Sequence, residues 1–406
     1  INVNFTQINS TTFHRILNPK SLSSMFKKLV IVLTAITFLL FGLLFLPPFE
    51  HIRNYLSWGK HSIFDFRTHP TRLVENSNMP QLWPLDSAYN KLQIPADLLA
   101  QIDSNNTHAF LVIQNGKLLY ERYWDGYTKD SISGSFSAAK SIISMLVGIG
   151  LNEGKIKSLD QPVGNYVPHF KEGDLAKVRI KDLLTMSSGS NYKESDQSYL
   201  GLSARMYYAD DEQYVIDLME AKEAPGVNWE YRSGDTQVLG LVLEKAFGKD
   251  ISTLASEYFL KPMGAEHDAL WLLDGEKKHE KAFCCFNGVA RDYARFGELM
   301  LTDGQWKGKQ IVPEAYMKAA MTPASYLKDP TEGGKPVDYY GYQFWIVNHN
   351  GMAIPSMNGL FGQYVFAIKE KNAIIVRLGE TKVVKPIHHF QPENYTYINA
   401  ALSILK

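Results

Sequence analysis

The run Gly134-Ser-Phe-Ser-Ala-Ala-Lys-Ser-Ile-Ile143 opens an apolar helix and places a hydroxyl and an amine three residues apart. Residues i and i+3 share one face of a helix, so Ser137 and Lys140 can act as a pair. The first turn of a helix also offers unpaired N–H groups and the positive end of the helix dipole, which favour an oxyanion. The arrangement predicts a serine nucleophile. The alternative is a capping serine followed by a solvated lysine.

The residues that follow favour the first interpretation, because they leave little polar surface on the helix. Asn152-Glu153-Gly154 then supplies a glycine stop. A helix that is apolar nearly all round is a buried one, and burial lowers the pKa of an amine. The apolar positions are Ile142, Ile143, Leu146, Val147, Ile149 and Leu151.

A second element lies 94 residues beyond Ser137, where Tyr231 and Ser233 occur in a turn-rich stretch that begins at Pro225. The apolar pattern of another helix, Val238–Leu243, follows. A tyrosine on such a loop can reach a distant site, and a nearby lysine cation can stabilise its phenolate. Tyr231 is therefore a candidate proton carrier, with a packing role as the alternative.

Together these motifs resemble a serine hydrolase family. It contains class C β-lactamases, penicillin-binding-protein-like D,D-peptidases, esterases and 6-aminohexanoate-dimer hydrolases. The resemblance covers roughly residues 80 to 400, and Phe283-Cys-Cys285 with the Gly-x-x-Gly-Gln form is most similar to the 6-aminohexanoate-dimer hydrolase branch. The motifs are Ser137-x-x-Lys140, Tyr231-x-Ser233, Ile180–Gly189, Ala290–Gly297, Tyr340–Trp345 and Gly359-Leu-Phe-Gly-Gln363.

The resemblance implies acyl transfer. Ser137 would attack a carbonyl while Lys140 and Tyr231 remove its proton, and water would then cleave the acyl-enzyme. The backbone N–H groups of Ser137 and Leu360 would form the oxyanion hole. The sequence does not assign the resting base to the lysine or to the tyrosine, because two groups this close titrate as a pair.

One departure from the family pattern concerns the substrate. Members that bind β-lactams have a Lys-Thr-Gly triplet on the strand lining the site, whereas this chain has Met357-Asn358-Gly359 there. We expect these three residues to contact substrate. Without the lysine cation, recognition of a penicillin or D-Ala-D-Ala carboxylate is in doubt.

The remaining pattern predicts an α+β fold of the β-lactamase/transpeptidase type, as the resemblance also implies. An antiparallel sheet would be built from both chain ends and flanked by helices, with a mainly helical subdomain, roughly residues 155 to 285, inserted. Asn115-Gly116 is a strong hairpin signal. The expected elements are the hairpins Ala109–Ile113 with Lys117–Tyr123 and Gln363–Ile368 with Ala373–Arg377, and the closing helix Tyr395–Leu405.

Near the N-terminus, Leu29–Leu46 is a run of 18 uncharged, mostly apolar residues, which would span about 27 Å as a helix. Pro47-Pro-Phe-Glu50 follows in place of a small-residue cleavage site, so we favour a membrane anchor over a cleaved signal and secretion. Arg15, Lys20, Lys27 and Lys28 precede the run without an acidic residue, which predicts a cytoplasmic amino end and a hydrolase on the outer side.

The expected organisation has four parts. Residues 1–24 are Ser/Thr/Asn-rich, are assigned no fold and resemble upstream translation, since Met25 looks like a natural start. Residues 25–48 form the anchor or signal, 49–80 a proline-containing linker, and 81–406 the hydrolase domain.

Composition excludes several function classes. The 42 basic and 42 acidic residues cancel, and no basic stripe suggests a nucleic-acid partner. The sequence has no spaced histidine pair for a metal and no phosphate-binding loop, so we expect no metal and no cofactor. The two cysteines, Cys284 and Cys285, are adjacent; we favour two buried thiols over a vicinal disulfide, because Phe283 and Phe286 flank them.

The sequence therefore predicts a membrane-anchored hydrolase of an ester or small amide, with a small-molecule substrate. Two alternatives stay open. One is a peptidoglycan D,D-peptidase or β-lactamase, and the other is a non-catalytic binding or sensor domain with the same fold. The sequence defines neither the substrate nor the oligomeric state.

Overall fold

The structure is a computed structural model that describes residues 19–46, 49–194, 201–208, 211–275, 278–382, 384 and 386–406. The chain divides into two compact units, residues 1–59 and 60–406, which are described separately.

The first unit contains the apolar helix that the sequence predicts. Helix α2 is Pro19–Leu43, and its segment Ser23–Leu43 is long and apolar enough to cross a membrane, a property that a signal sequence shares. Helix α3 follows as Glu50–Trp58. The expectation that residues 1–24 lack structure is wrong for 19–24, since proline is well tolerated in a first helical turn and nothing after it interrupts α2. Residues 1–18 lie outside the described part of the chain.

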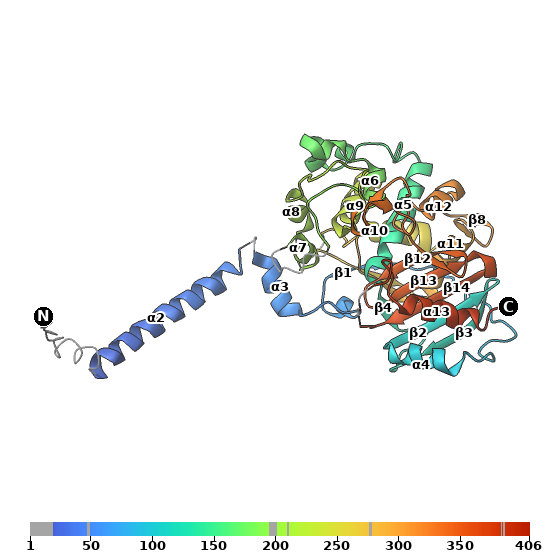
Figure 1. Cartoon of the computed structure of the whole chain (residues 1–406), viewed down its shortest axis with the longest axis horizontal. Coiled ribbons are helices and arrows are strands. Elements are labelled where there is room, and N and C mark those ends of the chain that lie inside the picture. The colour runs from blue at the N-terminus through green and yellow to red at the C-terminus, as the bar shows by residue number, and fades with distance from the viewer. Residues whose placement is uncertain are drawn as a thin grey trace, which may run out of the picture. The chain divides into compact units, whose positions relative to one another are not determined.

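The second unit is built around a six-stranded antiparallel sheet with the strand order β11-β12-β13-β14-β2-β3 (Figure 1). Strand β14 pairs with β2, so the sheet joins the two ends of the chain, and both predicted hairpins are present. The strands are β2 (Thr107–Gln114), β3 (Lys117–Tyr123), β11 (Trp345–His349), β12 (Met352–Gly359), β13 (Gln363–Ile368) and β14 (Ala373–Gly379).

Helices cover both faces of this sheet. Alternate side chains of β2 point to opposite faces and pack in two different hydrophobic clusters. Leu111 and Ile113 belong to one hydrophobic cluster, and Phe110 and Val112 belong to another. Helices α5 and α11 contact the sheet on the side of the first cluster, and α4 and α13 on the side of the second. These helices are α5 (Ala139–Asn152), α11 (Ala290–Leu301), α4 (Ala96–Ser104) and α13 (Glu393–Leu402).

A mainly helical region and a smaller sheet complete the unit, which confirms the predicted α+β class. The small sheet has the order β1-β5-β6-β4. Its strands are β1 (Thr71–Val74), β5 (Ala269–Leu272), β6 (Phe286–Val289) and β4 (Ile132–Gly134). The helices are α6 (Ile180–Leu184), α7 (Leu202–Tyr208), α8 (Glu212–Asp217), α9 (Ser233–Phe247), α10 (Ile251–Ala255), the π-helix η7 (Ser256–Leu260) and, after α11, α12 (Glu314–Ala320).

The stretch expected to be a linker up to residue 80 is in part folded. Strand β1 pairs with β5, and the side chains of Ile63 and Val74 are fully buried. The compact unit therefore begins at residue 60 rather than at 81. A strand of four residues is too short to give a clear alternating pattern, which is why the sequence did not reveal it.

We expect a chain that starts at Lys60 to unfold at a higher temperature than one that starts at Gln81. The shorter chain loses β1 and two buried aliphatic side chains, each of which contributes about 1.5–3 kcal/mol to stability. Thermal unfolding followed by circular dichroism measures the difference. Equal midpoints would show that residues 60–80 are a linker after all.

Candidate active site

The predicted nucleophile lies at a sharp connection between β4 and α5. Ser137 is the middle residue of a single 3-10 turn, Phe136–Ala138 (η3), that leads directly into α5. Phe136 has a φ of +44°, a left-handed conformation that is uncommon for a residue with a side chain. A hydrogen bond to β6 holds the turn in place: the buried Ser135 donates its N–H to the carbonyl of Phe286 at 2.8 Å.

Lys140 is buried one turn further along, with 1% of its surface exposed. Its Nζ donates to the Ser137 Oγ at 3.0 Å, to the Ser233 Oγ at 3.0 Å and to the Phe283 carbonyl oxygen at 2.6 Å. An ammonium group has three N–H donors, and each of them has an acceptor here. The amine is therefore held in one orientation against the predicted nucleophile.

Tyr231 lies on the other side of the same amine, just before α9. The Lys140 Nζ is 5.1 Å from the centroid of its ring. The ring stacks on Trp345, with centroids 5.5 Å apart, and meets Tyr340 edge-on at 6.2 Å. The structure thus brings Ser137, Lys140 and Tyr231 together, and two aromatic side chains fix the tyrosine.

Burial shifts the pKa values of Lys140 and Tyr231 in opposite directions. It lowers the pKa of Lys140 from its usual 10.5 to about 8, although the negative charge of Glu194 opposes this shift. It raises the pKa of Tyr231 far above 10, and Glu194 adds to that shift while Ser137 opposes it. Near neutral pH the phenol keeps its proton. Of the two groups, the Lys140 amine is the one that can lose its proton near neutral pH and then accept another.

Glycine brings β12 against the nucleophile turn. A Cβ atom on Gly359 would lie 2.1 Å from the carbonyl oxygen of Ser135, a separation that no side chain permits. The end of the strand is thus pressed onto the backbone two residues before Ser137. Leu360, the predicted second oxyanion donor, is the next residue and is exposed.

Two side chains of the sheet hold the loop that begins at Leu360. The Nη1 of the buried Arg377 donates to the carbonyls of Phe361 and Gly362, both at 2.8 Å. Gln363 donates its Nε2 to the Leu360 carbonyl at 3.1 Å. These contacts restrain the peptide groups beside the predicted oxyanion hole. The sequence motif contained Gln363, but nothing in it indicated the role of Arg377.

The structure buries the side chain of Met357, one of the three residues expected to contact substrate. Its side chain is fully buried in the main hydrophobic cluster, because side chains alternate along β12 and that of Met357 points into the core. Asn358, the next residue, is half-buried. Its Oδ1 is buried and has no hydrogen-bond partner among the described residues.

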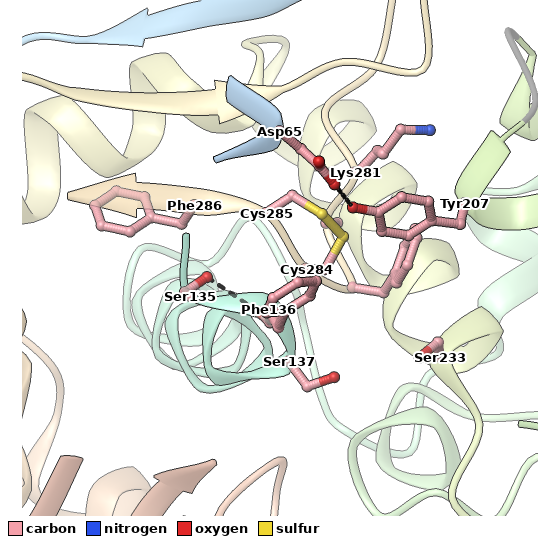
Figure 2. The surroundings of a disulfide bond; sticks show 12 residues. Asp65, Ser135, Phe136, Ser137, Tyr207, Ser233, Lys281, Cys284, Cys285 and Phe286 are labelled. Carbon is pink, nitrogen blue, oxygen red and sulfur yellow. Dashed lines mark hydrogen bonds between the residues drawn. A yellow bond between two sulfur atoms is a disulfide. The ribbon is translucent and has the colours of Figure 1, made fainter. Parts of the chain in front are cut away.

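The structure joins Cys284 and Cys285 in a disulfide, so the expectation of two thiols is wrong (Figure 2). Cys285 has a φ of +74°, and this turn of the backbone brings two adjacent side chains to the same side. In an extended strand they would point to opposite faces. The preceding residue is Phe283, whose carbonyl accepts from Lys140.

Glu194 is a neighbour of the site that the sequence did not single out. Its Oε1 accepts from the Ser233 hydroxyl and its Oε2 from the Ser233 N–H, both at 2.9 Å. No periodicity or motif marks this glutamate, because it lies in an irregular connection before α7.

We expect Gly359→Ala to reduce kcat by about a hundredfold or more, since the added methyl must push β12 away from the nucleophile turn. Steady-state hydrolysis of a p-nitrophenyl ester measures the loss, and Ala353→Ser, at an exposed position of β12, is the control for general damage to the strand. Wild-type turnover in Gly359→Ala would mean that the close approach is not needed.

The disulfide makes a separate prediction. Protein unfolded without reductant should contain no thiol that reacts with a thiol reagent, and protein unfolded after reduction should contain two. Two reactive thiols in both samples would contradict the disulfide.

Comparisons with known proteins agree with this architecture. Residues 99–385 match the Beta-lactamase family. A 6-aminohexanoate-dimer hydrolase from Paenarthrobacter ureafaciens is 25% identical over 300 residues, which are 70% of this chain and 74% of that protein.

Solved structures share the fold. One from Bacillus anthracis, provisionally assigned as a 6-aminohexanoate-dimer hydrolase, has a TM-score of 0.72 at 24% identity and covers 86% of this chain and 93% of its own. A family VIII carboxylesterase has a TM-score of 0.61 at 17% identity, covering 79% and 98%. The predicted fold and family are confirmed: the chain belongs to the Beta-lactamase family and is a serine hydrolase.

Proposed function

We propose that the chain hydrolyses an ester or a small linear amide through an acyl-enzyme on Ser137. The observation that carries the proposal is the contact of the Ser137 hydroxyl with the buried Lys140 amine, beside the Tyr231 ring. The similarity to a 6-aminohexanoate-dimer hydrolase and to a carboxylesterase supports the same reaction class.

In this mechanism neutral Lys140 takes the proton of Ser137 as the Oγ attacks the carbonyl carbon. The N–H groups of Ser137 and Leu360 stabilise the oxyanion. Tyr231 gives its proton to the departing alcohol or amine as the bond of that group to the carbonyl carbon breaks, and Lys140 then passes the proton it took from Ser137 to the phenolate. In the second step Lys140, again neutral, takes a proton from the water that attacks the acyl carbon, and that proton goes to the Ser137 Oγ as its bond to the acyl group breaks.

The charges near the site favour a neutral or cationic substrate over a carboxylate. Met357 replaces the lysine of the β-lactam-binding triplet, and the carboxylate of Glu194 lies two hydrogen bonds from Lys140. An anionic group would therefore meet repulsion and no dedicated partner. For this reason we place ester or amide hydrolysis ahead of peptidoglycan D,D-peptidase or β-lactamase activity.

We further propose that α2 anchors the protein in a membrane with the hydrolase unit on the outer side. The length and apolar composition of α2, together with the basic residues that precede its apolar part, support this topology. Protease treatment of intact cells tests it: cleavage of the hydrolase unit is expected, and protection would contradict the orientation. A chain shortened by removal of α2 would instead indicate a cleaved signal.

Ser137→Ala should lose turnover of a p-nitrophenyl ester by about a millionfold and should not react with a fluorophosphonate probe. Ser104→Ala, which changes an exposed serine at the end of α4, is the control and should keep both properties. If Ser137→Ala and wild type behave alike across esters, a chromogenic cephalosporin and 6-aminohexanoate oligomers, the fold serves binding instead.

The kcat/KM for ester hydrolysis should rise with pH and level off above about 8, because neutral Lys140 is the base and its pKa is lowered to about 8. Below that pH the amine is protonated and the rate falls tenfold per pH unit. Lys140→Arg, which stays charged, should be inactive throughout. A flat profile between about pH 6 and 9 would exclude Lys140 as the base.

A further inference from the structure

The hydroxyl of Ser233 lies between the Lys140 amine and the Glu194 carboxylate. It accepts from the Lys140 Nζ at 3.0 Å and donates to the Glu194 Oε1 at 2.9 Å. A hydroxyl has one proton to donate, so Glu194 decides the direction of this bond and leaves the oxygen lone pairs for the amine. The result is one chain of polar contacts from Glu194 to Ser137.

We propose that Glu194, acting through Ser233, is a positioning residue that holds the Lys140 amine in the orientation in which it faces the Ser137 hydroxyl. The inference rests on the proposed function, and it adds a residue that does not touch the reacting atoms. Glu194 reaches them by two hydrogen bonds, from Ser233 to the carboxylate and from Lys140 to Ser233.

The location of the carboxylate has a physical reason. Ser233 is the first residue of α9, and its N–H also donates to the Glu194 Oε2 at 2.9 Å. A negative charge is stabilised at the N-terminus of a helix, where N–H groups have no partner within the helix. Ser233 itself is 2% exposed, so the helix end and the carboxylate hold its hydroxyl in place.

No other acid among the described residues acts on Lys140 in this way. On α9, Asp235 instead accepts a hydrogen bond from the Ser188 hydroxyl at 2.6 Å. On the segment before Phe283, the buried Lys281 pairs with Glu212. Tyr231 keeps its proton, since burial raises its pKa. Glu194 is thus the anion that favours the charged form of Lys140 against burial.

Glu194→Gln tests the inference in the full-length protein, with p-nitrophenyl acetate as substrate. The variant keeps the shape of the side chain and removes its charge. We expect kcat to fall by about tenfold to a hundredfold with little change in KM, because the amine is less well aimed. The acidic limb of kcat/KM should also move to lower pH, because the anion that favoured protonated Lys140 is gone. If Glu194 only stabilised the start of α9, its replacement would not shift the acidic limb of the kcat/KM profile.

Three further variants complete the experiment. Glu194→Asp should restore the wild-type pH limb in part, and Glu172→Gln, at an exposed glutamate of another surface, should match wild type. Ser233→Ala should reduce kcat to a similar extent, and the double variant should lose less than the sum of the two, as expected for residues in one chain of contacts.

The outcomes separate this inference from the proposed function. If Glu194→Gln retains the wild-type kcat and pH limb while Ser137→Ala is inactive, Glu194 has no positioning role and the Ser137 mechanism stands. If Ser137→Ala remains active, the proposed function itself is overturned. Additive losses in the double variant would also contradict the inference, because they would show that the two side chains act independently.

Discussion

The burial of one amine is the constraint on which the site depends. Lys140 lies inside the hydrophobic core, where a free ammonium would be very costly, and three acceptors from three parts of the chain compensate. Each acceptor therefore has to be delivered to within about 3 Å by its own element. Ser137 comes from the turn before α5, Ser233 from the start of α9, and the carbonyl of Phe283 from the loop before β6.

The fold delivers these groups by packing its two sheets and its helical region around α5. The large sheet contributes the Gly359 contact through β12, and the small sheet frames the nucleophile turn through the pairing of β4 with β6. Every residue of α5 from Ala139 to Gly150 is buried, so other elements pack around the whole helix. Its position, and with it that of Lys140, follows from the packing of all the layers at once.

Much of this could be predicted from local patterns. Ser137, Lys140, the two hairpins and the apolar helices are marked by spacing, turn residues and periodicity, which short stretches of sequence carry in full. Contacts between distant segments are not marked in this way. The burial of Met357, the link from Glu194 to Ser233 and the pairing of β1 depend on which strand face meets which helix. The disulfide occurs where Cys285 has a positive φ, and the composition of the sequence does not predict that backbone conformation.

The three bonds of Lys140 have a consequence for selectivity. All three N–H groups of the Lys140 ammonium donate hydrogen bonds to the protein, so none is left to donate to a ligand. Under the proposed mechanism, the contacts that hold a ligand would then come from other groups beside the amine, such as the peptide N–H groups of the oxyanion hole and the ring of Tyr231.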